Sequence, residues 1–260
     1  MRRSAPILLL IALAATACPL EDSAPTTGAT TQLTVFAASS LTAAFTRIGR
    51  DFETANPGTT VTFNFGPSDG LAGQIETEGA ADVFASASPT WMDQVETNPG
   101  ISDRGDFAQN RLVIITPPDD PGGIGSLRDL ANPGVQLVLA AEGVPVGDYA
   151  REALGNAGVA GPAEANVVSN EEDDASVVAK IASGEADAGI VYVSDVSEQV
   201  APTVRTVEIP DESNVVATYP IAAVTGTSNL SEARAFVSYV TGTQGQATLE
   251  AYGFLPAPAP

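Results

Sequence analysis

Four short segments of the sequence place small or polar residues between an apolar run and the start of an amphipathic pattern. They read AASSL (37–41), GPSDGL (66–71), VPVGDY (144–149) and EEDDASVV (171–178). Each is a predicted junction between a strand and a helix. The first N–H groups of a helix lack intrahelical partners, and the helix dipole is positive at that end. Several helix starts that converge on one point would therefore bind an anion without lysine or arginine.

Three side chains near these junctions add hydrogen-bond donors. Ser40 and Ser68 carry hydroxyl groups beside two of the predicted helix starts, and Tyr192 ends the apolar run GIVY. Ligands bind at the carboxyl ends of strands in open α/β sheets, which is where this tyrosine would lie. Singly, the serines are more simply read as N-caps and the tyrosine as a half-buried strand residue. Their recurrence at equivalent positions of the fold predicts a site.

The composition excludes many other functions. The 260 residues include 11 Lys plus Arg, 32 Asp plus Glu, one Cys and no His, for a net charge of −21. Such acidity argues against a nucleic-acid surface and against a basic membrane-binding patch. The absence of histidine removes Ser-His-Asp and Cys-His catalysis, and a single cysteine removes Cys-based zinc sites, iron–sulfur clusters and disulfides within the chain. Carboxylate chemistry, hydroxyl and amide hydrogen bonding, or pure binding remain, and we expect no cofactor.

The N-terminus has the features of an export signal. In residues 1–18, Arg2 and Arg3 precede a short apolar run that leads directly to Cys18. The run is too short for a comfortable membrane span and is typical of a signal peptide. Its end resembles a bacterial lipobox, which implies that Cys18 is lipid-modified and anchors the mature chain to the outer face of the cell membrane. Residues 19–31 have the composition of a flexible tether.

From Gln32 onward, apolar runs alternate with helical patterns, which predicts an α/β fold with mostly parallel sheets. The expected strands cover 33–37, 60–65, 81–87, 111–118, 135–140, 166–168, 188–193, 204–209 and 215–224. The expected helices cover 41–55, 71–77, 89–96, 126–130, 147–157, 175–183, 231–240 and 245–251.

These units divide into two batches around the Pro-rich segment 116–123, and the late strand 215–224 could return the chain to the first batch. We therefore expect two lobes with a ligand cleft between them. One lobe would comprise 32–115 and 218–260, and the other 116–217.

From about Gln32 to Leu255 the sequence resembles the molybdate-binding proteins of ABC uptake systems. The matching segments are VFAASSLTAAF, FGPSDGLAGQIETEGAADVFASASPTWMD, NRLVIITP, EGVPVGDYAREAL, GIVYVSD, YPIAAV and YGF. The resemblance implies the two-lobed type II periplasmic-binding-protein fold, with a mixed, mostly parallel sheet flanked by helices in each lobe. In that fold the lobes close over a tetrahedral oxyanion.

The resemblance also implies which residues bind. Ser40 and Ser68 would supply hydroxyl and amide donors from the first lobe. Val146 and Asp174 would supply backbone N–H groups from the second lobe, and Tyr192 its phenolic hydroxyl.

Three positions depart from the family pattern. Asp69 stands where Ser or Gly is frequent, Val146 where Ala is common, and Asp174 where an apolar residue is common. A carboxylate beside a bound anion repels it. We therefore expect Asp69 to point away from the site and Asp174 to face solvent.

The implied function is capture of molybdate, and of tungstate because of its similar size, by a monomer that delivers the anion to an ABC permease. Other interpretations of the residues stay open. They are a receptor for another tetrahedral oxyanion such as sulfate, a surface enzyme that uses carboxylates, a structural lipoprotein, and a cation receptor. Paired acids at 171–174 are the feature an enzyme would use, although adjacent acids usually form a solvated face.

Overall fold

The computed structural model describes residues 30–258. The predicted signal peptide, the anchor at Cys18 and nearly all of the predicted tether lie outside the described residues.

Strands and helices alternate along the chain, as the sequence predicts. The strands are β1 (Thr31–Ala38), β2 (Thr59–Gly66), β3 (Val83–Ala85), β4 (Ile101–Thr116), β5 (Leu137–Ala140), β6 (Val167–Glu171), β7 (Ala188–Tyr192), β8 (Arg205–Glu208), β9 (Val216–Val224) and β10 (Leu255–Pro256). The α-helices are α1 (Thr42–Ala55), α2 (Ser68–Glu78), α3 (Pro89–Thr97), α4 (Pro145–Asn156), α5 (Ala160–Glu164), α6 (Asp174–Ala182), α7 (Leu230–Thr241) and α8 (Thr243–Ala251). Short 3-10 helices in the described residues are η1 (Ser39–Leu41), η2 (Leu127–Ala131) and η3 (Val193–Asp195).

The strands form one continuous path in the order β2-β1-β3-β9-β4-β7-β5-β6, and β8 and β10 also pair with β4. Strand β1 is parallel to β2 and β3, and β5 is parallel to β6 and β7. Strands β4 and β9 run antiparallel to their neighbours and join these two parallel groups. The sheet is therefore mixed, with its parallel strands at the two ends.

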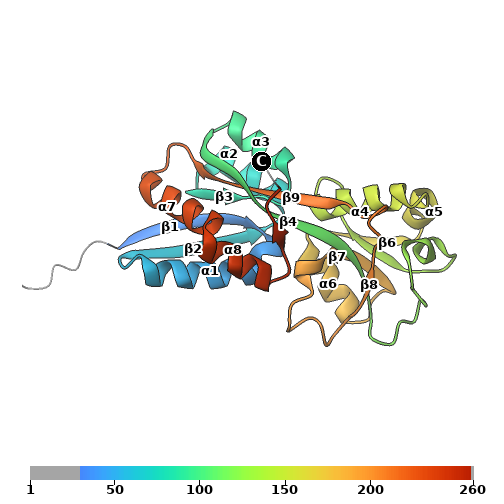
Figure 1. The fold of residues 1–260 in the computed structure, drawn as a ribbon. Coiled ribbons are helices and arrows are strands. Elements are labelled where there is room, and N and C mark those ends of the chain that lie inside the picture. The colour runs from blue at the N-terminus through green and yellow to red at the C-terminus, as the bar shows by residue number, and fades with distance from the viewer. Residues whose placement is uncertain (1–29, 259–260) are drawn as a thin grey trace, which may run out of the picture.

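Strand β4 connects two lobes. Its residues from Ile101 to Arg111 pair with β9, whereas its residues from Leu112 onward pair with β7 and β8. Helices α1, α2, α3, α7 and α8 surround the first parallel group, and α4, α5 and α6 surround the second (Figure 1). The predicted two-lobed α/β fold is confirmed.

The prediction for β4 was too short, because it began at Arg111 whereas the strand begins at Ile101. The N-terminal half carries Asp103, Arg104 and Asp106, which break the apolar run. Register shifts between Ser102 and Gly105 and between Asp106 and Ala108 interrupt its pairing with β9. Such bulges allow charged side chains within a strand that remains paired, which a strict alternation rule misses.

Helix α1 illustrates why the predicted elements form where they do. Phe45, Ile48 and Phe52 repeat at helical spacing and are buried. The Phe45 ring lies 5.7 Å from the ring of Phe107 on β4 and 6.1 Å from that of Phe236 on α7. This aromatic packing fixes α1 against the sheet, so the β1–α1 junction is held in place for any ligand.

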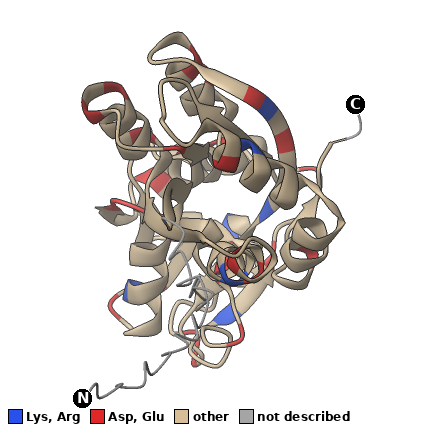
Figure 2. Ribbon diagram, turned by 90° about the vertical axis from the view of Figure 1, so that its left-hand side faces the viewer, with Lys and Arg blue, Asp and Glu red and all other residues tan. Residues whose placement is uncertain are grey.

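Charged side chains cover the outside of the molecule. Acidic residues are spread over many helices and loops, with few basic residues among them (Figure 2). Several basic residues pair with acids nearby, as in the ion pairs between Lys180 and Glu171 and between Arg205 and Asp120, both at 2.7 Å.

Candidate anion-binding site

A small cavity lies between the lobes, where β1, β2 and β7 end and α2, α4 and α6 begin. It is lined by Ala38, Ser39, Gly66, Pro67, Ser68, Ala87, Val144, Pro145, Val146, Asp174 and Tyr192. It leaves about 10 Å³ for the centre of a water molecule, which is room for about one water. None of these residues is a lysine or arginine, so any anion here would be held by neutral donors.

Helix starts from both lobes face this cavity. In α2 the first intrahelical hydrogen bond runs from the Leu71 N–H to the Pro67 carbonyl at 3.0 Å. The N–H of Ser68 therefore has no acceptor within the helix. In α4 the first such bond, from the Asp148 N–H to the Val144 carbonyl, is also 3.0 Å long. Pro145 at the first helical position has no N–H, and the amide of Val146 is therefore the first donor of α4.

Gly147 allows α4 to begin close to the end of β5. A Cβ atom at this position would lie 2.3 Å from the Ala141 carbonyl oxygen and 2.4 Å from that of Ala140. Only glycine fits such a close backbone approach. The glycine thus fixes where the start of α4, including Val146, meets the cavity.

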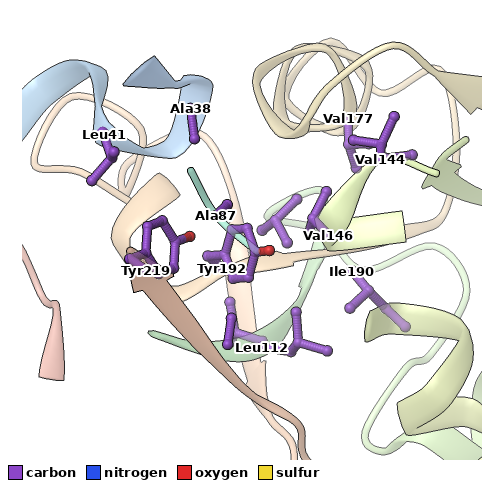
Figure 3. Close-up of a cluster of buried hydrophobic side chains, with 14 of the residues drawn as sticks. Ala38, Leu41, Ala87, Leu112, Val144, Val146, Val177, Ile190, Tyr192 and Tyr219 are labelled. Atoms are coloured by element: carbon purple, nitrogen blue, oxygen red, sulfur yellow. The ribbon is translucent and has the colours of Figure 1, made fainter. Parts of the chain in front are cut away.

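Tyr192 contributes a hydroxyl with no partner. The side chain is 1% exposed, and its hydroxyl oxygen makes no hydrogen bond to any of residues 30–258. Its ring lies between Tyr219 and Val146 (Figure 3), with its centroid 5.8 Å from that of Tyr219. Burial raises the pKa of Tyr192 well above 10, so the hydroxyl stays protonated. A buried, unpaired donor that lines a cavity is costly unless a ligand accepts its hydrogen bond.

The two predicted serines differ in their surroundings. The Ser68 oxygen accepts a hydrogen bond from the Ala87 N–H at 3.0 Å, which leaves the Ser68 hydroxyl hydrogen available to donate. Ser40 lies 3.0 Å from the Tyr219 hydroxyl and lines a larger adjoining cleft of about 540 Å³. Thus Ser68, Val146, Asp174 and Tyr192 meet at the small cavity, whereas Ser40 lies beside it.

The expectation that Asp174 faces solvent was wrong. Asp174 is 3% exposed and lines both the small cavity and the larger cleft. Its Oδ1 atom accepts hydrogen bonds from the hydroxyl of Ser39 and, at 2.9 Å, from the N–H of Ala175. Burial raises the pKa of Asp174 to about 6. The helix starts inside the contact between lobes, and this position, rather than helix periodicity, buries the side chain. Asp69, in contrast, does not line the cavity.

Two contacts that the sequence did not indicate join the lobes beside the cavity. One is the hydrogen bond from Ser39 to Asp174, and the other runs from the Trp91 indole N–H to the Gly143 carbonyl at 3.0 Å. Tyr219, the partner of Ser40, was also missed as a site residue. Its place in the apolar run YPIAAV suggested only a core position, and nothing local marks the strand pairing that brings it here.

The whole folded region matches one family of proteins. Residues 33–255 match the family model for bacterial extracellular solute-binding proteins. The chain belongs to this family. Solute-binding proteins of this family are extracellular, which places the folded region outside the cytoplasm. Their role is to bind solutes.

Named relatives within the solute-binding proteins are similar over most of their length. The chain is 38% identical to the molybdate-binding protein ModA of Mycobacterium tuberculosis over 246 residues, which cover 94% of this chain and 92% of the relative. It is 34% identical to ModA of Escherichia coli, with 86% and 88% of the two chains covered.

Solved structures of solute-binding proteins share the fold. The periplasmic molybdate-binding protein of Azotobacter vinelandii matches with a TM-score of 0.76 at 19% identity, covering 87% of this chain and all of that one. The sulfate-binding protein SubI of M. tuberculosis matches with a TM-score of 0.75 at 15% identity, covering 87% of each chain.

Residues 30–258 contain neither a membrane-spanning helix nor a cluster of metal ligands. No helix there has both the length and the apolar character to cross a membrane. Within the same residues, no group of three or more His, Cys, Asp or Glu side chains is placed to hold a metal ion.

Proposed function

We propose that this protein captures molybdate, and tungstate as well, outside the cytoplasm and delivers it to an ABC permease. The observation that carries the proposal is the unpaired, buried hydroxyl of Tyr192 in a cavity where helix starts from both lobes meet. The similarity to ModA of M. tuberculosis over more than nine-tenths of the chain supports molybdate as the ligand.

The chemistry of binding follows from the donors. Molybdate is a tetrahedral dianion with four acceptor oxygens. Ser68 and Tyr192 would donate hydroxyl hydrogens, and the helix starts at Val146 and Asp174 would donate backbone N–H groups. Ser40 would donate its hydroxyl hydrogen to the anion once its hydrogen bond with the Tyr219 hydroxyl is broken. Hydrogen bonds to a charged acceptor are strong in a cleft that excludes water.

Lobe closure would couple binding to transport. Because the donors come from both lobes, a bound anion favours the closed arrangement through its higher affinity for that state. The permease would recognise the closed surface. The exact lobe limits, with 32–115 and 218–260 in one lobe and 116–217 in the other, belong to this proposal. So do the monomeric state and the lipid anchor at Cys18.

A thermal-shift titration tests the function. Molybdate should raise the melting temperature of the purified protein, because a ligand that binds only the folded state stabilises it. The double variant Ser40→Ala with Ser68→Ala should lose most of this shift. A matched control, Ser228→Ala with Ser231→Ala, removes two exposed hydroxyls of the first lobe and should keep it.

Tungstate and sulfate serve as further ligands in the same titration. Tungstate should behave like molybdate, and sulfate should give a smaller shift because it is smaller. A larger shift with sulfate would favour the sulfate-receptor alternative. An unchanged molybdate shift in the Ser40/Ser68 variant would reject the site.

A further inference from the structure

The Asp174 side chain occupies hydrogen-bond donors that an anion in the cavity would use. Its Oδ1 atom accepts hydrogen bonds from the Ser39 hydroxyl and from the N–H of Ala175, which is in the first turn of α6. Ser39 and Asp174 also line the cavity together with Tyr192. The ionised carboxylate thus already binds where helix α6 and η1 would offer donors to an oxyanion.

We infer that Asp174 acts as an internal competing anion, and that an oxyanion binds when this carboxylate takes up one proton from solvent. The inference rests on the proposed function. The carboxyl group, once neutral, no longer repels the dianion and presents an O–H donor to it. One proton thus moves from the buffer to the Asp174 carboxylate for each anion bound.

In the part of the chain that the structure describes, no lysine or arginine is placed to keep Asp174 ionised next to a dianion. Among residues 30–258 no lysine or arginine forms an ion pair with it. The titratable groups that face it are all acidic. They are Asp173 at the start of α6, Asp195 on η3, Tyr192 at the end of β7 and Tyr219 on β9. Each of these groups, if ionised, favours the protonated form of Asp174.

The sign of the pH dependence follows. Burial raises the pKa of Asp174 from its usual 3.8 to about 6 in the ligand-free protein. A dianion a few ångströms away raises this pKa further. A group whose pKa is higher in the complex makes binding strongest below its free-state pKa. The affinity should therefore fall above about pH 6, by up to about tenfold per pH unit.

Calorimetric titration of the protein with micromolar molybdate between pH 5.5 and 8.5 tests the inference. The dissociation constant of the wild-type protein should rise above pH 6. Titrations at pH 7.5 in buffers of different ionisation enthalpy should show uptake of about one proton per anion.

Variants identify the responsible group. Asp174→Asn keeps an acceptor for Ser39 and offers a permanent N–H donor, so its affinity should be independent of pH and tighter than wild type at pH 8. Glu172→Gln removes an exposed acid from the same segment. Its molybdate affinity should fall with pH as steeply as that of the wild-type protein. Asp195→Asn should also keep this pH dependence. If Asp174→Asn does not fold, the number of protons that the wild-type protein takes up per anion tests the inference.

The outcomes separate this inference from the proposed function. No molybdate binding by the wild-type protein at any pH would reject the function. Molybdate binding without proton uptake would reject the role of Asp174 while leaving the proposed function intact. So would a pH dependence of affinity that persists in Asp174→Asn and disappears in Asp195→Asn.

Discussion

At the scale of single residues, the candidate site combines a buried hydroxyl that lacks a partner with a buried carboxylate whose partners are donors that an anion could use. The Tyr192 hydroxyl is buried without a hydrogen bond, while one Asp174 carboxylate oxygen holds two donors. Both arrangements leave hydrogen-bonding capacity that a tetrahedral anion would redistribute. Neither residue is needed in this form for a well-packed core, because an apolar residue would fill the same space at lower cost.

Replacing Tyr192 by Phe should separate binding from stability. The ligand-free variant should be as stable as wild type or more stable, because a buried unpaired hydroxyl is removed. Its molybdate affinity should fall by about 10- to 100-fold, which corresponds to loss of one hydrogen bond to a charged acceptor. Chemical denaturation and calorimetry measure the two quantities. Tyr239→Phe, on α7 and packed against Phe52, is the control and should leave affinity unchanged; unchanged affinity in Tyr192→Phe would exclude this donor.

At the scale of elements, the site depends on how closely each helix begins after its strand. Tyr192 is the last residue of β7, and Ser39 follows directly after β1. Within each lobe, parallel neighbours bring their carboxyl ends to one edge of the sheet, so β1 ends beside β2 in the first lobe and β7 runs parallel to β5 in the second. Gly147 is the residue that lets α4 approach the end of β5 closely enough to take part.

Gly147→Ala tests this spacing. The added Cβ would meet two backbone carbonyl oxygens at under 2.5 Å, so the start of α4 must move. We expect a loss of about 1–3 kcal/mol in the free energy of unfolding together with weaker molybdate binding. Gly155→Ala, in the same helix, meets no atom within 4 Å and should be neutral or stabilising. Denaturant unfolding compares the two variants, and equal effects would show that the close approach is unimportant.

At the scale of the whole molecule, the net charge of −21 opposes the approach of any anion. Acidic residues cover many elements (Figure 2), yet no basic residue lines the small cavity to compensate. The surface field and the binding site are therefore separate properties. The surface field governs the association rate of the anion, and the binding site governs its dissociation rate.

Added salt should speed molybdate association. Raising the ionic strength from about 0.01 to 0.15 M shortens the Debye length from about 30 to 8 Å and screens the repulsion. The association rate should rise several-fold, while the dissociation rate stays nearly constant. Trp91, the single tryptophan, is bonded across the lobes and offers a fluorescence signal for stopped-flow measurement. A slower association in salt would show that the net charge does not act on the ligand.

The local sequence was sufficient to predict most helices and strands and the order in which the helix starts follow one another along the chain. Apolar runs and helical spacing located β1, α1, β7 and α6 within a few residues, because burial of one face imposes those periods. It failed where tertiary context overrides a local pattern. The first half of β4 is charged but paired through bulges, and α5 contains Gly161 and Pro162, which favour a loop when read alone.

The sequence alone was enough to predict the two-lobed α/β fold, the absence of lysine and arginine from the four helix starts and the residues that begin those helices. The contacts of Asp174 with Ser39 and of Tyr219 with Ser40 follow from tertiary packing and are visible only in the folded chain. These pairs lie 135 and 179 residues apart in the chain. The first contact depends on how the two lobes meet, and the second depends on the pairing of β9 with β4. The periodicity of a single element contains no information on either.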